Sequence, residues 1–391
     1  MFRITGTFVT SFRAERAEVT RDRAAWVVVG AYDYALHREG SLFLVGLRNA
    51  GRAYNTERTY AGRTALYLSY CAHQRLDWAA VTVWQLSRFL HWLVEEPLPS
   101  RSRRGGGPER FRGDNTANAI VGTVCEFLAF GVRMGWVAKE LLGQLTEPKY
   151  LRYLPPGYDP GEDDQHRTVR SRLIKLASLD AGIEWLTIEQ IARLVDVARH
   201  ARDRFLVLLL WSTGMRIGEA LGLRREDMHL LPDSQAFGCQ VKGPHVHVRR
   251  RLNSNGAWAK SRRPRVIPVT TELVAGYADY LYERAAVPEA EFTEQVLVNL
   301  FRAPLGRAMT YSNAKDLFDR LARAADLIAR PHMVRHGAAT HWIRGGTDRS
   351  VVSDLLGHLS DSSMSVYVHA SDDDKRAAVE RADARRLEIA R

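Results

Sequence analysis

The chain has 391 residues, enough for two or three domains, and 46% of them are hydrophobic, which excludes a disordered chain. Its longest plain apolar run, Phe205 to Trp211, has seven residues, far short of the roughly 18 that a membrane span needs. The N-terminal residues lack the compact apolar region of a signal peptide. We therefore expect no membrane partner, whereas a net charge of +11 and an isoelectric point near 9.7 favour a polyanionic one.

The three cysteines indicate a reducing compartment. Cys71, Cys125 and Cys239 are far apart and odd in number, so they suggest no disulfide framework and match no metal-binding spacing. We expect reduced thiols in a cytoplasmic protein and no metal site.

Residues 1–50 carry no chemical motif. Val27 to Val29 and Leu42 to Val45 are short, β-prone or buried pieces. We treat this segment as an N-terminal extension of unknown role.

Residues 51–150 show helical periodicity. Helical periodicity begins at about Thr56, and further helices are expected at 82–94, with Thr82 as N-cap, and at 115–135. Pro97 and Pro99 end the helix at 82–94. The pattern predicts a small helical bundle whose aromatic side chains form its core.

Residues 151–185 resemble a linker. Pro155, Pro156 and Pro160 interrupt any regular element, and Arg170 and Arg172 then add positive charge. Such a segment suits a strap that joins two domains around a polyanion.

Residues 186–391 predict a second domain that is mainly helical, with a small antiparallel sheet. A capping box at Thr187 to Gln190 opens it. Val246 and Val248 alternate with two histidines, and the Asn255-Gly256 turn and Arg265 to Val269 complete a hairpin. Helices are expected at 187–200, 205–211, 216–222, 271–286, 312–326, 332–345, 350–356, 361–368 and 373–389.

Two segments concentrate positive charge. Arg249 to Arg265 contains seven Lys or Arg and no acid, and Arg101 to Arg112 contains five Arg and one Glu. A merely solvated basic face remains the alternative for both. The candidate DNA-binding residues are Arg101, Arg103, Arg104, Arg249, Arg250, Arg251, Arg262, Arg263 and Arg265.

Cations and a phenol recur at ordered spacings further along. The chain has Arg216, then His332-Met-Val-Arg335-His336, then Leu356-Gly357-His358, and then Tyr367 nine residues after His358. Breaking and remaking a phosphodiester requires a nucleophile that stores the bond and fixed cations that meet the charge on the phosphate oxygens. It also requires a general acid for the leaving 5′ oxygen.

These strings, with Thr213-Gly-Met-Arg216-Ile-Gly-Glu219-Ala-Leu, resemble the tyrosine recombinase (phage integrase) family. The resemblance spans about 187–370 and, more loosely, 56–135. It implies a SAM-like core-binding bundle followed by an α+β catalytic domain.

The resemblance also implies roles for individual residues. Arg216 and Arg335 clamp the scissile phosphate, Tyr367 attacks it to form a 3′-phosphotyrosyl link, and His358 donates a hydrogen bond to it. His332 assists proton transfer, and Lys260 is the general acid for the 5′ oxygen. Glu219 and His336 support these groups.

Duller interpretations compete with this assignment. Lys242, beside Gly243, is the alternative to Lys260, because the expected glycines do not flank Lys260. His332 and His336 have the i, i+4 spacing of a zinc site, but Arg335 between them would repel a metal. Tyr311 is a decoy tyrosine outside the family strings.

We therefore predict a site-specific DNA recombinase or integrase without metal or nucleotide cofactor. The alternatives are a catalytically silent DNA-binding relative and a type IB topoisomerase-like nicking enzyme. The family implies double-stranded DNA as partner, a dimer on each site and a tetramer in the synapse. An accessory DNA-bending or directionality protein and a nucleoid-associated location complete the expectation.

Overall fold

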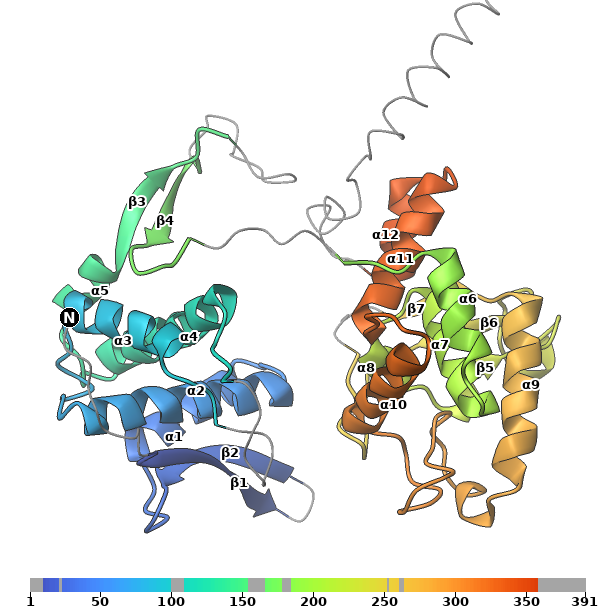
Figure 1. Ribbon diagram of the computed structural model, residues 1–391, viewed down its shortest axis with the longest axis horizontal. Helices are drawn as coiled ribbons and strands as arrows, with labels where there is room; N and C mark the ends of the chain where they lie inside the picture. The colour runs from blue at the N-terminus through green and yellow to red at the C-terminus, as the bar shows by residue number, and fades with distance from the viewer. Residues whose placement is uncertain are drawn as a thin grey trace, which may run out of the picture. The chain divides into compact units, whose positions relative to one another are not determined.

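The computed structural model describes residues 10–20, 23–99, 109–153, 166–177, 184–251, 253–259 and 264–357 (Figure 1). Described residues up to 177 belong to one compact unit, and those from 184 onward belong to a second. Both units are mainly helical with small antiparallel sheets, so the predicted fold class is confirmed.

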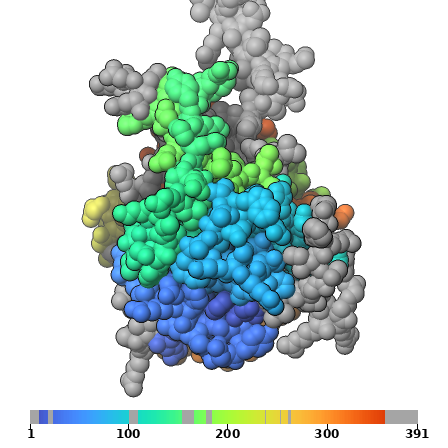
Figure 2. Space-filling view, turned by 90° about the vertical axis from the view of Figure 1, so that its left-hand side faces the viewer, coloured from blue at the N-terminus to red at the C-terminus, as the bar shows by residue number. Residues whose placement is uncertain are grey.

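The first unit begins with a β-hairpin and a helix. β1 (Phe12–Thr20) pairs antiparallel with β2 (Arg23–Gly30), and α1 (Arg38–Asn49) follows. Val28, Phe43 and other side chains of these elements are buried in the same core as Phe127. The boundary expected at residue 50 therefore lies inside this unit, and of the two alternatives for Leu42 to Val45 the buried one holds, because Phe43 and Leu44 are buried within α1. In Figure 2 the blue surface of the N-terminal elements continues without a break into the cyan surface of the residues around α3.

The predicted bundle consists of α2 (Tyr54–His73), α3 (Val83–Glu95) and α4 (Asp114–Arg133). Thr82 caps α3 as expected. Its hydroxyl oxygen accepts from the Gln85 backbone N–H, and the Gln85 side-chain oxygen accepts from the Thr82 backbone N–H. By length and composition, α4 is the one described helix that could cross a membrane, but its apolar side chains fill this core.

Part of the expected linker is folded onto the first unit. After α5 (Glu140–Leu145), β3 (Thr146–Tyr150) pairs with β4 (Thr168–Arg172) in a two-stranded hairpin. Beyond the hairpin, the Asn118 side chain donates to the Leu176 carbonyl at 3.0 Å and accepts from its N–H at 2.9 Å. The chain through Leu176 is thus tied to α4.

The second unit is built around α7 (Ala201–Thr213), whose side chains are apolar and buried from Phe205 to Leu210 apart from Leu208. It contacts α6 (Ile188–Asp196), α9 (Thr271–Ala285) and α11 (Pro331–Arg344). The capping box predicted at Thr187 and Gln190 heads α6. A helix covered on several sides must be apolar around its circumference, which explains why this stretch has no polar face.

A three-stranded antiparallel sheet flanks these helices, in the order β5 (Met228–His229), β6 (His245–Val248) and β7 (Arg265–Pro268). The pairing of the two predicted strands is confirmed, and β5 is an addition. Val246, Val248 and Ile267 lie on the face turned to the core, so His245 and His247 lie on the opposite face.

The remaining elements complete the second unit. Gly357 ends the last described helix with a φ of 64°, as the sequence predicted. The helices expected at 361–368 and 373–389 lie outside the described residues. The other elements are α8 (Ile217–Ala220), η1 (Arg225–Asp227), η2 (Gln235–Phe237), η3 (Pro288–Ala290), α10 (Tyr311–Ala324) and α12 (Arg349–Leu356).

Candidate active site

Two of the predicted catalytic residues and one supporting residue meet at the C-terminal end of α7. Arg216 and Glu219 come from α8 and its N-cap, and Arg335 comes from α11. Other predicted residues lie outside the described part of the chain. These are Lys260, His358 and Tyr367, together with Arg101, Arg103, Arg104, Arg262 and Arg263.

Arg335 connects three helices. Its side chain is buried, its Nη1 donates to the Gly214 carbonyl at 2.7 Å, and its Nη2 donates to the Leu356 carbonyl at 2.9 Å. Gly214 has a φ of 57°, and a Cβ there would come within 2.9 Å of Leu356 Cδ2, so the turn requires glycine. These bonds place the end of α12, two residues before His358, beside the guanidinium of Arg335.

Glu219 is the buried acid that organises two arginines. Its carboxylate accepts from the Arg216 backbone N–H at 2.9 Å and from Arg265 Nη1 and Nη2 at 3.2 and 2.7 Å. The Arg216 Nη1 lies 3.4 Å from Glu219 Oε1. Burial by itself would raise the pKa of Glu219, but the hydrogen bonds and charge of Arg265, with the Arg216 N–H and charge, lower it below its ordinary value. Glu219 is thus an anion that holds α8 against the sheet.

Arg265 is a positioning residue, which corrects its sequence-based assignment to the DNA-binding set. Only 9% of its side chain is exposed. Besides its two bonds to Glu219, its Nε donates to the Leu355 carbonyl at 2.9 Å. Arg265 therefore links β7 to α8 and α12, and its guanidinium is committed to protein acceptors.

The neighbouring arginines divide into two kinds. Arg251 is also held inside the protein, because its guanidinium donates to both Asp227 carboxylate oxygens at 2.6 and 2.8 Å. By contrast, Arg249 has a half-exposed side chain, 3.8 Å from Asp227, and exposed Arg250 stacks over the Trp258 ring at 4.7 Å. Arg249 and Arg250 stay candidates for phosphate contacts, whereas Arg251 fastens the strand end to η1.

His332 and His336 lie one turn apart on α11. Their ring centroids are 4.1 Å apart with an interplanar angle of 80°. His332 is exposed on the first turn, whereas His336 is 8% exposed and lies against the core. This arrangement suits their expected roles, because the exposed His332 can exchange protons and the buried His336 can support it.

The segment that leads to Lys260 packs tightly on α8. The Asn255 side chain donates to the carbonyls of Leu221 and Met309 at 2.9 and 2.8 Å. A Cβ on Gly218 would lie 2.9 Å from the Trp258 carbonyl oxygen, so glycine permits this approach. Residue 259, the last described before Lys260, is buried.

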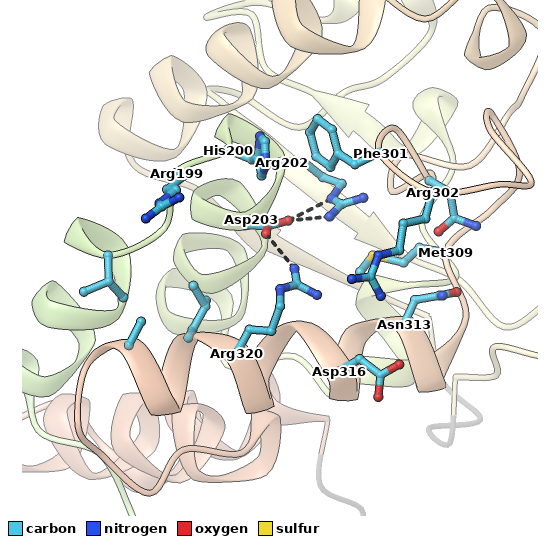
Figure 3. Close-up of a pocket in the computed structure, with 14 residues that line it drawn as sticks. Arg199, His200, Arg202, Asp203, Phe301, Arg302, Met309, Asn313, Asp316 and Arg320 are labelled. Carbon is cyan, nitrogen blue, oxygen red and sulfur yellow. Dashed lines mark hydrogen bonds and ion pairs between the residues drawn. The ribbon is translucent and has the colours of Figure 1, made fainter.

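A separate pocket lies at the other end of α7 (Figure 3). Asp203 accepts from Arg202 Nε and Nη2 at 2.9 and 2.6 Å and from Arg320 Nη2 at 3.2 Å, and Arg202 stacks on Phe301 at 4.7 Å. The ten residue steps from Asp203 to Thr213 rise about 15 Å along the helix. The ion network around Asp203 therefore lies apart from the site formed by Arg216, Glu219 and Arg335. The sequence analysis did not identify this network.

A pH effect follows from Glu219. Because its folded-state pKa lies below the ordinary value of 4.5, its contribution to stability is present above that value and is lost as pH falls through the folded pKa. We expect the difference in melting temperature between the wild type and Glu219→Gln to narrow as pH falls from 7 to about 3. The control is Glu294→Gln, whose carboxylate is 69% exposed. A difference in melting temperature between the wild type and Glu219→Gln that stays constant down to the lowest pH would contradict the assignment of Glu219 as a stabilising buried anion.

Comparison with known proteins gives a family match and relatives of similar length. A sequence model described as the phage integrase family matches residues 184–374. Transposase A from transposon Tn554 of Staphylococcus aureus is 27% identical over 372 residues, covering 93% of this chain and 96% of that protein. Tyrosine recombinase XerC of Mycobacterium tuberculosis (strain ATCC 25177 / H37Ra) is 27% identical over 338 residues, covering 86% and 94%.

A solved structure shares the fold. The Tn1549 transposon integrase in complex with transposon right end DNA has a TM-score of 0.56 at 17% identity, and the match covers 88% of this chain and 99% of that one. At this identity the likeness concerns architecture. The four ordered strings, the family match over the second unit and the nearly full-length relatives together show that this chain belongs to the phage integrase family of tyrosine recombinases.

Proposed function

We propose that this chain is a site-specific recombinase that cleaves and rejoins duplex DNA through a 3′-phosphotyrosyl intermediate. The observation that carries the proposal is the convergence of Arg216, Glu219 and Arg335 with the end of α12, where the string that contains His358 begins. Fixed guanidinium groups at one point suit a reaction whose transition state concentrates negative charge on phosphate oxygens.

The proposed reaction has two proton transfers and one exchange of bonds at phosphorus. The Tyr367 oxygen attacks phosphorus while the bond to the 5′ oxygen breaks. Lys260 gives its proton to that leaving oxygen, and His332 takes the proton of the phenol. Arg216, Arg335 and His358 hold the non-bridging oxygens. Rejoining reverses these steps with a 5′ hydroxyl from the partner strand.

The topology of the sheet supports Lys260 over Lys242 as the general acid. β7 begins at Arg265, which contacts Glu219, and Arg265 pairs with Val248 at the end of β6. The 249–264 segment therefore leaves the sheet at the end nearest Arg216. Lys242 precedes β6 and lies at the opposite end, about 13 Å away along a four-residue strand.

We further propose that the chain acts in transposition. The similarity to transposase A covers 93% of the chain. The unmatched residues are fewer than those that β1, β2 and α1 span together, so the match includes at least part of these elements. The likeness therefore includes part of the segment that precedes the helical bundle. The proposed partners of the chain are double-stranded DNA and further copies of the chain itself, with two copies on each DNA site and four in a synapse. An accessory DNA-bending or directionality protein and a nucleoid-associated location complete the proposal.

A nicked duplex carrying the junction of the mobile element that encodes this chain tests the proposal. Loss of the short fragment beyond the nick prevents rejoining, so cleavage should accumulate a protein–DNA adduct on a denaturing gel. Peptide mapping should place the 3′-phosphate on Tyr367. An adduct formed equally on unrelated duplexes, with relaxation of any supercoiled plasmid, would favour the topoisomerase alternative. Binding to the junction without an adduct would favour the silent relative.

The basic segment after β6 gives a second expected result. Replacing Arg262 and Arg263 with Gln should weaken binding about equally for specific and unrelated DNA and reduce the slope of log K against log salt by about 2, roughly 0.9 per lost phosphate contact. The control is Arg251→Gln, because that guanidinium is bound to Asp227 and its loss should leave the slope unchanged. A changed site preference with unchanged affinity would contradict the role of this pair.

A further inference from the structure

Four potential metal ligands gather on the outer face of the sheet. They are His229, Cys239, His245 and His247, and one ligand atom from each lies within 4.8 Å of every other. None of them belongs to the strings that mark the recombinase site. No motif in the sequence indicated them, because the cysteine lies ten residues after the first histidine and six before the second.

The strand register explains why these side chains meet. His229 of β5 pairs directly with His245 of β6, so the two project from the same face. His247 lies two residues further along β6 and shares that face, while Val246 and Val248 point into the core. The loop from 230 to 244 then crosses this face. Gly238, with a φ of 76°, turns the loop so that Cys239 reaches the histidines.

Three of the six ligand–ligand distances are close to the edges of a tetrahedral coordination sphere. Cys239 Sγ lies 3.3 Å from His245 Nε2 and 3.5 Å from His247 Nε2, and the two Nε2 atoms are 3.1 Å apart. Zinc bonds of about 2.0–2.1 Å to nitrogen and about 2.3 Å to sulfur give tetrahedral edges of roughly 3.3–3.6 Å. An ion among these three atoms would require shifts of only a few tenths of an ångström. A ring nitrogen of His229 lies within 4.8 Å of each of them and would have to move inward by up to roughly an ångström to complete the site.

One imidazole is already held in the tautomer that a metal needs. His245 Nδ1 lies 2.7 Å from the Gly243 carbonyl oxygen. A carbonyl can only accept, so Nδ1 carries the hydrogen and Nε2 keeps its lone pair toward the cluster. Metal-binding histidines usually donate their other N–H in this way. His245 is fully buried, and Cys239 is 9% exposed.

The cluster has a route to solvent. His229, Cys239 and His247 line a cavity together with residues of the 230–241 loop. A cation can therefore reach the ligands without unfolding the sheet. Arg249 also lines this cavity, and Asp227 lies 3.8 Å from its guanidinium and partly offsets its charge.

We propose that His229, Cys239, His245 and His247 bind one zinc ion as a structural site. One thiolate and three neutral imidazoles fill the four positions of a closed tetrahedral site, and binding releases the thiol proton to water. The ion fastens the 230–244 loop to β5 and β6. The metal-free alternative is a hydrogen-bonded cluster in which the thiol and one imidazole donate to their neighbours.

Metal analysis of the purified full-length protein separates these alternatives. We expect about one zinc per chain, and substitution with Co²⁺ should give the absorption of a tetrahedral thiolate complex. Cys239→Ser should abolish the sulfur-to-cobalt band, and His247→Ala should reduce the bound zinc at least about tenfold after dialysis. Cys125→Ser is the matched control and should keep both signals.

The zinc and cobalt measurements do not depend on recombination activity. Wild-type protein that holds no zinc and gives no cobalt band on titration would overturn the proposal, as would full zinc content in both Cys239→Ser and His247→Ala. If Cys239→Ser does not fold, His247→Ala decides, because this side chain is only partly buried. Tyr367→Phe protein should bind the same amount of zinc as the wild type, so failure of either proposal is recognised separately.

Discussion

Tyr367→Phe protein should bind its DNA site as the wild type does but form no covalent adduct. The substitution removes the phenolic oxygen that stores the phosphodiester bond and leaves the ring in place. Loss of a nucleophile reduces turnover on the order of 10⁶-fold in a well-studied hydrolase, so no adduct should be detectable. A nicked duplex and a denaturing gel measure the adduct, and a mobility shift measures binding.

Tyr311→Phe provides the control for this experiment. Tyr311 begins α10 and is 59% exposed, and it lies outside the strings that define the family. We expect this variant to form the adduct at the wild-type rate. An adduct that survives in Tyr367→Phe and disappears in Tyr311→Phe would exchange the roles of the two residues.

Breaking the Glu219–Arg265 pair should destabilise the second unit by about 3–5 kcal/mol, the cost of leaving one member of a buried ion pair without its partner. Either Glu219→Leu or Arg265→Met leaves the other charge buried. DNA cleavage should fall as well, because Glu219 fixes the backbone of Arg216 and Arg265 fixes Leu355. Urea unfolding of the full chain, followed by hydrogen exchange of α8 peptides, measures the stability.

The double variant Glu219→Leu with Arg265→Met separates the two effects. Replacing both partners of a buried pair by apolar side chains is often neutral for stability. We therefore expect the double variant to recover most of the lost stability but not the cleavage, since Arg216 still lacks its anchor. Recovery of cleavage together with stability would show that the pair acts through folding alone.

Elements with strong local signals could be predicted from the sequence. Thr82 and Thr187 mark helix starts with their capping boxes, and Gly357 marks a helix end, because these residues satisfy backbone groups within one turn. β5 could not be predicted, since two residues carry no periodicity and the strand exists only through its pairing with β6.

Charge was harder to interpret than secondary structure. Arg249 to Arg265 is a uniform basic run in the sequence, yet Arg251 and Arg265 bind buried carboxylates that lie elsewhere in the chain. A linear pattern does not contain the long-range acids Asp227 and Glu219, so it cannot distinguish an arginine that faces solvent from one that fastens two elements. The alternation of His245 and His247 was visible, but the residues that complete their cluster come from another strand and a loop.

The two hydrogen bonds between Asn118 and Leu176 limit how far the two units can separate, because they fix the point at which the connecting chain leaves the first unit. The second unit is anchored again at Leu186, whose N–H donates to the Met333 carbonyl at 3.3 Å. The ten peptide steps between these anchors span at most about 33–36 Å when fully extended. If both units bind DNA, as the proposed function requires, capture of DNA by either unit raises the local concentration of the other, and binding of the second unit becomes an intramolecular event. Insertion of a long glycine–serine stretch between Ala177 and Glu184 would dilute this avidity without altering either binding surface.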